Sequence, residues 1–487
     1  MLSLGDSCGS QSRTGDLMFT IHGNTYRHCD GHQRREFLTA GALAVGGLTL
    51  ADLLRAEAAQ GIRSSEKAII QIHLDGGPPQ MDMIDLKPDA PVEIRGEFKP
   101  IASKIVGLQI CELMPKVAGL ADKFAFIRSL VGSAGAHDAF QCQSGFSSKD
   151  LQSLGGRPAL GSVLAKLRGS TKDVAPPFVD LMQGRPLVRN SARPGFLGPT
   201  YNPFRPDISK MFSRELEAGM KKELAAKGAD HTIRLTLVDG LSPERLNDRA
   251  QLLAGFDKVR RDLDAAGNMD AMDRFIQQAT NILTSGKFAA AMDLSKESPK
   301  VLERYTPPVA AADQDRFVTA EDGTSARKLL LARRLIEAGV RCVSLSFSDF
   351  DTHSKNFPRM RQLLPIIDHG LHALVTDLEE RGMLNDVTIV VMGEFGRTPK
   401  INNNGGRDHW PAVSPVILAG GGMKVGQVIG ATDRHAGAVV SRPVHVQELF
   451  ATLYRNLGID PDTTTLHDPT GRPQHIVDQG KALRELV

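Results

Sequence analysis

Aromatic residues, cysteines and long apolar runs are scarce in this 487-residue chain, and each scarcity excludes a class of protein. Aromatic residues make up 5% of the sequence and the formal net charge is only +3, so a nucleic-acid-binding face of basic and aromatic side chains is not expected. The five cysteines follow neither a zinc motif nor a disulfide framework. No apolar run approaches the roughly 20 residues that a membrane-spanning helix needs, so we do not expect an integral membrane protein.

Two catalytic motifs are absent as well. The sequence has no Gly-x-Ser-x-Gly elbow, which argues against the triad of an α/β-hydrolase. The glycines at 420–422 lack the Lys-Ser/Thr ending of a phosphate-binding loop and are interpreted as a turn. The chain is 41% hydrophobic and 24% charged, which is typical of a soluble globular protein with one large core or two domains.

The first 58 residues are interpreted as an export signal with an N-terminal extension. Arg34 and Arg35 precede a Phe-Leu pair, a small and weakly apolar run at 39–51, and small residues around Ala58 that a signal peptidase prefers. This order resembles a twin-arginine signal, which implies passage through the twin-arginine export machinery to the periplasm or the extracellular space. The alternative, an ordinary amphipathic helix, is disfavoured because glycines interrupt this stretch at 41, 46 and 47.

The remainder is expected to form one domain at 59–460 and a C-terminal tail at 461–487. Runs rich in apolar residues predict buried strands at 67–74, 124–130, 178–181, 341–347, 387–391 and 414–419. Amphipathic helices alternate with these strands, which predicts a three-layer α/β/α fold with a mostly parallel sheet covered on both faces. Charged helical patterns predict a helical insertion at about 200–312, either as a cap over the sheet edge or as a solvated flank.

Acidic and imidazole side chains follow several of these strands. Because parallel strands end at the same edge of a sheet, we expect these side chains to converge there. Carboxylates and imidazoles together suit one or two divalent metals, namely zinc, manganese, magnesium or calcium. Two ions bridged by a carboxylate would stabilise the oxyanions of a displacement at phosphorus or sulfur. The predicted metal ligands are Asp75, Asp351, His353, Glu394, Asp408 and His409.

Other residues near the same edge are expected to contact the substrate. The loop after the strand at 124–130 offers a nucleophile or an anion contact, and His137 is preferred because serine is common at helix starts as a cap. The other two candidates of this loop are Ser129 and Ser133. The motifs that carry the predicted ligands also contain Arg397, Arg407 and Trp410, the single tryptophan, which are the expected substrate-binding residues.

Four motifs behind the leader resemble a known family. They are Leu74-Asp75-Gly76-Gly77, Phe350-Asp351-Thr352-His353, the stretch from Gly393 to Pro399, and Gly406-Arg407-Asp408-His409-Trp410. Together they resemble the exported domain-of-unknown-function family numbered 1501, which is similar to the alkaline phosphatase and sulfatase superfamily. That resemblance implies an alkaline-phosphatase-like fold with divalent metals at the strand ends and hydrolysis of small-molecule or glycan phosphate or sulfate esters. By position it implies that Asp75, Asp351, His353, Glu394 and His409 are the ligands.

Departures from the superfamily pattern leave two functions open. Phe395 stands where a ligand histidine is expected, so one metal site would be a ligand short. No Cys-x-Pro-x-Arg or Ser-x-Pro-x-Arg sequence is present, and Cys142 has a different context, so the nucleophile is unassigned and activated water is an alternative. The first function is an exported metal-dependent ester hydrolase. The second is a non-catalytic relative that uses the cleft to bind a polyanion or glycan or an envelope protein.

Overall fold

The computed structural model describes residues 67–487 apart from 154, 171–172, 189–190, 213–221, 223–278, 283–284 and 309–320. Contacts along the chain divide it into two units, Met1–Gln60 and Gly61–Val487. The predicted leader with Arg34 and Arg35 and most of the predicted helical insertion lie outside the described residues. All of the described residues belong to the second unit.

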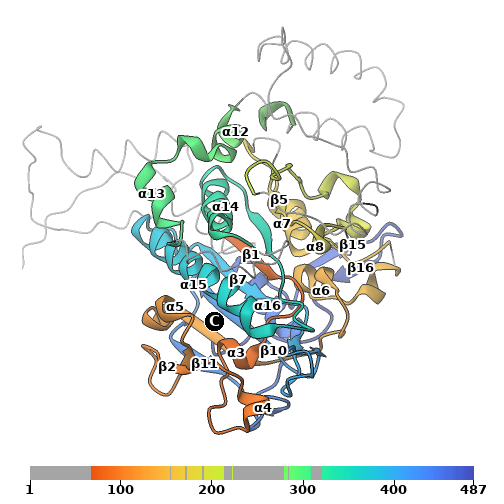
Figure 1. Ribbon diagram of the computed structural model, residues 1–487. Coiled ribbons are helices and arrows are strands. Elements are labelled where there is room, and N and C mark those ends of the chain that lie inside the picture. Colours follow the sequence, from red (N-terminus) through yellow and green to blue (C-terminus); the bar gives the residue numbers. More distant parts are fainter. Residues whose placement is uncertain are drawn as a thin grey trace, which may run out of the picture. The chain divides into compact units, whose positions relative to one another are not determined.

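An eight-stranded sheet forms the centre of this unit (Figure 1). Strand β1 pairs in parallel with β6 on one side and β7 on the other, and β5 pairs in parallel with β6. Strand β10 runs antiparallel to both of its neighbours, β7 and β4. The mostly parallel sheet is thus confirmed. The strand order is β11 (Gln427–Ile429), β4 (Phe124–Val131), β10 (Ser414–Gly420), β7 (Val387–Met392), β1 (Ala68–Leu74), β6 (Cys342–Phe347) and β5 (Phe178–Leu181), with β14 (Val444–His445) paired to β4.

Both faces of the sheet are covered, because side chains alternate across each strand and both sets are apolar. In β7, Ile389 and Val391 pack into one core, whereas Val390 and Met392 pack into the other. The first core is completed by α5 (Pro115–Gly119), α14 (Arg327–Glu337) and α15 (Asn356–Glu380), and α14 and α15 lie side by side in Figure 1. The second is completed by α6 (Ala139–Ser144), α7 (Leu160–Arg168) and α16 (Val446–Asn456). This is the predicted three-layer arrangement.

The C-terminal residues beyond 460 belong to the second core. Strands β15 (Thr465–His467) and β16 (Pro473–His475) form a hairpin, and Leu466, Leu483 and Leu486 are buried with the α16 side chains. Shorter elements connect the main ones: α3 (Gln80–Met83), α4 (Val92–Arg95), β2 (Pro100–Ala102), β3 (Gln109–Cys111), α8 (Arg185–Val188), α12 (Lys287–Met292), α13 (Pro299–Arg304), β8 (Gly396–Arg397), β9 (His409–Trp410), β12 (Ala431–Thr432) and β13 (Val439–Ser441). Six single 3₁₀ turns, among them η1 (Ala121–Lys123), complete the described elements.

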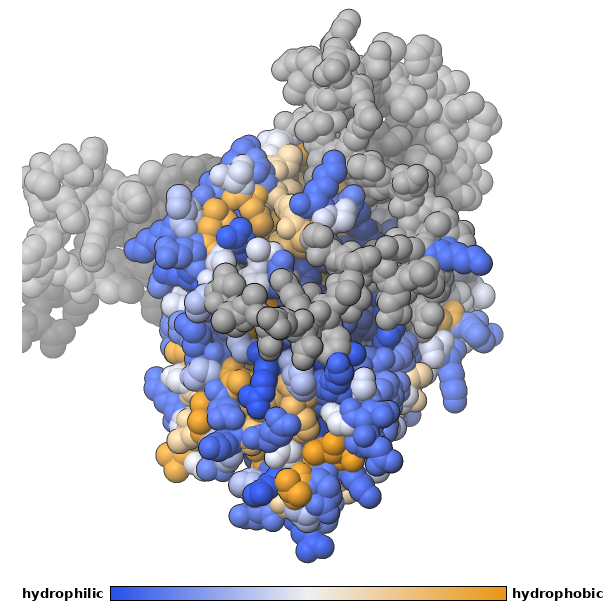
Figure 2. Space-filling view, viewed as in Figure 1, coloured by the Kyte–Doolittle hydropathy of each residue, from blue (hydrophilic) through white to orange (hydrophobic). Residues whose placement is uncertain are grey.

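The surface is mixed in character. On the face seen in Figure 2, hydrophobic side chains form small groups that hydrophilic residues interrupt. None of the helices in the described part of the chain combines the length and the apolarity that crossing a bilayer requires.

Candidate metal centre at the strand ends

Two glycines allow the loops after β1, β6 and β7 to approach one another. Gly76 has a φ of +110°, and a Cβ atom there would lie 2.3 Å from the backbone nitrogen of Asp351. Gly77 has a φ of +87°, and its Cβ would lie 2.6 Å from the ring of Phe395. Only glycine accepts both the left-handed backbone and the contact. The Asp-Gly-Gly motif therefore brings Asp75 next to the loops that carry Asp351 and Glu394.

His73, Asp75 and Glu394 form a buried set that we call the inner group. One ligand atom from each lies within 4.8 Å of the others. All three residues are between 2% and 4% exposed. The Gly76 N–H donates to Glu394 Oε2 at 3.0 Å, and His73 Nε2 lies 3.6 Å from Glu394 Oε1. Within the described residues neither ring nitrogen of His73 makes a hydrogen bond.

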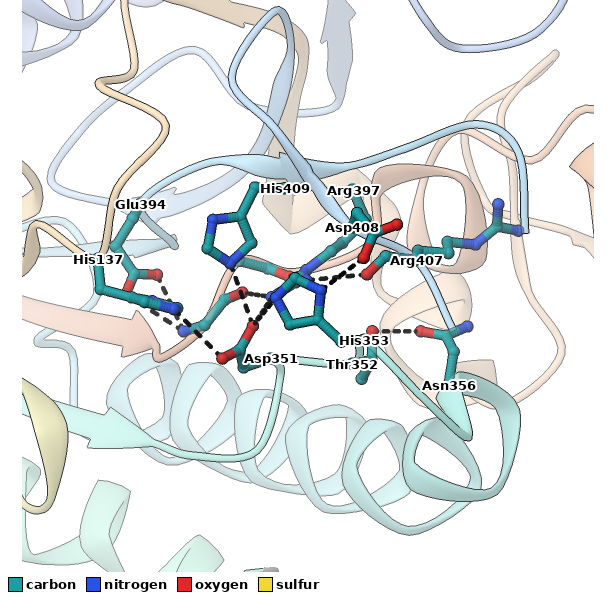
Figure 3. A network of polar contacts seen from close by, with 12 residues as sticks. His137, Asp351, Thr352, His353, Asn356, Glu394, Arg397, Arg407, Asp408 and His409 are labelled. Atoms are coloured by element: carbon teal, nitrogen blue, oxygen red, sulfur yellow. Dashed lines mark hydrogen bonds and ion pairs between the residues drawn. The ribbon is translucent and has the colours of Figure 1, made fainter. Parts of the chain in front are cut away.

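His137, Asp351 and His409 form a second set, the outer group, whose ligand atoms also lie within 4.8 Å of one another. These side chains are 20–25% exposed, so they lie nearer to solvent than the inner group. His137 links the two groups, because its Nδ1 lies 3.5 Å from Glu394 Oε1 and its Nε2 lies 3.2 Å from Asp351 Oδ2. Figure 3 shows the imidazoles arranged around the Asp351 carboxylate.

Both oxygens of Asp351 are engaged by cationic or imidazole groups. Arg397 Nη2 donates to Oδ1 at 2.6 Å, and Arg185 Nη1 donates to Oδ2 at 3.1 Å. The Nε2 atoms of His353 and His409 lie 3.1 and 3.3 Å from Oδ1. Arg185 Nη1 also lies 3.2 and 3.1 Å from the two ring nitrogens of His137.

Two carboxylates of the centre, Asp351 and Glu394, have lowered pKa values. Burial alone would raise the pKa of Asp351, but hydrogen bonds from His137, His409 and Arg397 outweigh it, so this pKa lies well below its usual range. The pKa of Glu394 is likewise lowered, because the charge of His73 and a hydrogen bond from His137 outweigh burial. Burial lowers the pKa of His137, but hydrogen bonds to Asp351 and Glu394 more than offset it and raise that pKa to about 9.

His353 and Asp408 lie at the exposed rim of the centre. The Asp408 carboxylate lies 2.6 Å from His353 Nδ1, and it also accepts a hydrogen bond from Asn402. The side chains of His353 and Asp408 are 49% and 52% exposed. Asp408 therefore fixes the orientation of the His353 ring, whose other nitrogen faces Asp351, and it lies outside both ligand groups.

The two arginines expected to bind substrate are fully buried. Arg397 donates to the carbonyls of Gly77 and Arg407 as well as to Asp351, so it joins three loops of the centre. Arg407 makes a bidentate ion pair with Asp82, with donor–acceptor distances of 2.8 and 3.0 Å. In Figure 3 its guanidinium group points away from the imidazoles. Arg407 thus holds the loops in place and does not reach the ligand groups.

The remaining predicted residues have separate surroundings. The Trp410 indole donates to the carbonyl of Gly437 at 2.7 Å. The Ser129 hydroxyl is buried on β4 and donates to the carbonyl of Arg442 at 2.6 Å, so it is not part of the network around Asp351. Ser133 is half-buried in the loop that carries His137.

His73 and Arg185 were missed by the sequence reasoning. His73 lies inside β1, two positions before Asp75 and therefore on the same face of the strand. An imidazole within an otherwise apolar buried run was the signal that could have identified it. Arg185 follows β5, the strand next to β6, so its position after a predicted strand was a weaker signal of the same kind.

The inner group fits a divalent metal ion. Its donors are one imidazole and two carboxylates, a set that zinc and manganese accept readily. The His73 ring is buried and its nitrogens make no hydrogen bond in the described part of the chain, which is costly unless another group satisfies them. The outer group has the same donor types, but its carboxylate is already engaged by two guanidinium groups.

Comparisons with known proteins give one family and several partial structural overlaps. A family model described as "Protein of unknown function (DUF1501)" matches residues 66–487, and no curated protein sequence matches the chain. The structure of Ps i-CgsB in complex with k-i-k-neocarrahexaose overlaps with a TM-score of 0.36 and 11% identity, over 81% of this chain and 72% of that one. The PsFucS1 sulfatase from Pseudoalteromonas sp. overlaps with a TM-score of 0.37 and 12% sequence identity. That overlap covers 90% of this chain and 74% of the sulfatase chain. The phosphonate monoester hydrolase of Agrobacterium radiobacter overlaps with a TM-score of 0.30 and 13% sequence identity. That overlap covers 86% of this chain and 77% of the hydrolase chain. Scores this low transfer neither substrate nor activity to this chain.

Proposed function

We propose that this chain, which belongs to the DUF1501 family, is an exported metal-dependent hydrolase of phosphate or sulfate esters. The family expected from the four sequence motifs is thereby confirmed. The observation that carries the proposal is the pair of adjacent ligand groups at the sheet edge, His73-Asp75-Glu394 and His137-Asp351-His409. Ligand groups this close together, joined through His137, suit the stabilisation of charge on a reacting ester.

The residues have distinct proposed roles. A bound divalent ion would polarise an ester oxygen and make water a better nucleophile near neutral pH. His73, Asp75 and Glu394 would hold that ion, with Asp351 and His409 available for a second. His137 and Arg185 lie on the more exposed side and would donate hydrogen bonds to the oxyanion of the ester. Either the Ser133 hydroxyl or a water molecule would attack, since Ser129 is engaged elsewhere.

A substrate panel tests the proposal. Purified protein is stripped with a chelator, reloaded separately with zinc, manganese, magnesium or calcium, and offered an aryl phosphate, an aryl phosphodiester and an aryl sulfate. We expect turnover of at least one ester class by the loaded protein and none by the stripped protein. Glu394→Gln serves as a matched variant, because it keeps the side-chain shape and removes the charge. Equal hydrolysis by stripped and loaded protein would exclude a metal-dependent reaction.

A non-catalytic binding function is the second candidate, and Phe395 favours it. The Phe395 ring is fully buried, and its centroid lies 4.1 Å from that of His409, where the superfamily pattern places an imidazole ligand. A protein with this substitution could keep a metal cleft for a sulfated glycan or an envelope protein without hydrolysing an ester. Metal-loaded protein that binds a sulfated oligosaccharide and leaves the whole panel intact would support this function over the first.

Export rests on the leader sequence, which lies outside the described residues. We expect residues 1–60 to carry a fused fluorescent protein to the periplasm through the twin-arginine machinery. Replacing Arg34 and Arg35 by lysine should keep the fusion in the cytoplasm. Cell fractionation measures the outcome, and equal export of both fusions would contradict the assignment.

A further inference from the structure

We propose that a surface hollow lined by Lys149 and Arg193 is a second anion-binding site. It would hold a further sulfate or phosphate group of an oligosaccharide whose scissile ester lies at the metal centre. This inference rests on the proposed function and names the class of its substrate, an oligosaccharide with more than one anionic group. Three properties of the hollow support it, namely its lining, its charge and its position beside His137.

The hollow has the size and the lining of a subsite for a small polar group. Its volume is about 400 Å³, within the usual range for ligand pockets. The lining comes from the 3₁₀ turn η2 (Ser148–Leu151), from Gln152 and from Arg193. Ser148 and Gln152 offer hydrogen bonds to sugar hydroxyl groups, and Leu151 offers an apolar contact. The described residues of this lining include no aromatic side chain, so they offer no stacking surface for a nucleic-acid base.

The charge of the hollow is positive. Lys149 and Arg193 are both exposed, and neither cationic group has an anionic partner among the described residues. The carboxylate on η2 is that of Asp150, and its Oδ2 atom is engaged by Ser147, which donates its N–H at 2.9 Å and its hydroxyl at 3.0 Å. Two cations that lack a counter-charge favour an anionic ligand.

The hollow lies beside the centre because the segments that line it also carry residues of the centre. Asp138 directly follows His137 and accepts a hydrogen bond from the Ser148 N–H at 2.7 Å, so η2 begins next to the outer group. Arg193 belongs to the segment that follows Arg185 in the chain. The side chains of His137 and Arg185 are 20% exposed. A ligand that contacts them from solvent therefore has the hollow next to it.

Backbone hydrogen bonds join the two segments that line the hollow. The Ala159 N–H donates to the Arg193 carbonyl at 2.9 Å, and the Phe196 N–H donates to the Gly156 carbonyl at 2.8 Å. The segment after η2 is thereby fixed to the segment that carries Arg193. Backbone positions that are fixed before binding reduce the entropy cost of binding. They also favour ligands whose anionic groups have the matching separation.

Calorimetry with a matched pair of probes tests the second site. The probes are a disaccharide with two sulfonate groups, which are not hydrolysed, and the same disaccharide with one. Both are titrated into zinc-loaded protein at constant ionic strength. We expect wild type to bind the two-sulfonate probe at least about 10-fold more tightly than the other. In Lys149→Gln/Arg193→Gln that preference should fall to about 2-fold or less, because the second sulfonate loses both cations.

Two control variants separate the hollow from net charge and from the centre. Lys481→Gln/Arg484→Gln removes the same charge from exposed residues that do not line the hollow. It should change neither affinity by more than about 2-fold, since salt screens distant exposed charges. Arg185→Gln removes a donor that the sulfonate common to both probes would contact, so it should weaken the binding of both probes by a similar factor.

Each outcome separates the inference from the function. Equal affinities of wild type for the two probes, no binding of either, or an unchanged preference in Lys149→Gln/Arg193→Gln would overturn the inference and leave the hydrolase function standing. An oligonucleotide of the same charge that binds more tightly than the disaccharide would overturn the choice of a sugar. Wild type that prefers the two-sulfonate probe but hydrolyses none of the aryl esters would overturn the function and leave the second site standing. Circular dichroism checks the fold of each variant.

Discussion

At the scale of single residues, Gly76 controls the distance between the loops that form the centre. We predict that Gly76→Ala lowers the free energy of unfolding by roughly 3 kcal/mol, because the new methyl group would strain a left-handed backbone and collide with the Asp351 backbone. The same change should weaken metal binding, since Asp75 and Asp351 would be pushed apart. Denaturant unfolding and zinc titration measure the two effects.

Gly119→Ala is the matched control for this substitution. Gly119 ends α5, has no left-handed φ, and a Cβ atom there would have nothing within 4 Å. We expect a change of no more than about 1 kcal/mol in either direction. If Gly76→Ala were as mild as the control, the close approach of the Asp75 and Asp351 loops would not be a constraint on the fold.

Individual residues also show how far sequence reasoning reaches into the centre. Asp75, Asp351 and Glu394 could be placed there because each lies in the loop that follows a recognisable strand. His73 could not, because a histidine inside a strand is identified as part of a site only by its partner. That partner is Glu394, in the loop after a different strand. Arg185 depends likewise on β5 lying beside β6, which the local sequence does not specify. Arg407 has the residue type of an anion contact, and only its ion pair with buried Asp82 shows a structural use.

At the scale of elements, α15 and α5 are joined through Asp368. The Asp368 carboxylate accepts hydrogen bonds from the backbone N–H groups of Lys116 and Val117, at the start of α5. Burial raises the pKa of Asp368 to about 6, although these N–H groups oppose the increase. The folded protein therefore holds this proton more tightly than the unfolded chain does. The contribution of this bound proton to the free energy of unfolding is therefore complete below about pH 4. It is lost as the pH rises towards 6.

Asp368→Asn tests this coupling between the two helices. Wild type should lose about 2 to 3 kcal/mol of unfolding free energy through this group between pH 4 and pH 6.5, and the variant should not. Denaturant titrations at several pH values give the difference between the two proteins. An identical pH dependence in both would show that Asp368 ionises normally in the folded state.

Elements differ in how well local sequence defines them. The strands rich in β-branched residues, β1 and β7, begin and end within about two residues of the predicted limits, as buried runs of this kind usually do. The short edge strands β11 and β14 carry no such run and exist because β4 offers a free edge for pairing. Their sequences alone therefore could not predict them.

At the scale of the whole molecule, the sequence predicted the layers but not the order of the strands. Alternation of strands and helices is sufficient for a covered, mostly parallel sheet. The order of β4, β10 and β7, with β10 antiparallel between them, depends on contacts between segments far apart in the chain. The residues after 460 were expected to form a tail, but apolar side chains such as Leu483 and Leu486 pack against the second core.

The most direct measurement of the central claim is ester hydrolysis by one protein sample carried through metal removal and restoration. We predict that a chelator abolishes turnover of the responsive ester in wild type, that a divalent ion restores it, and that Glu394→Gln stays inactive throughout while remaining folded. Turnover that survives complete removal of metal, or a fully loaded wild type that hydrolyses no phosphate or sulfate ester, would contradict the account.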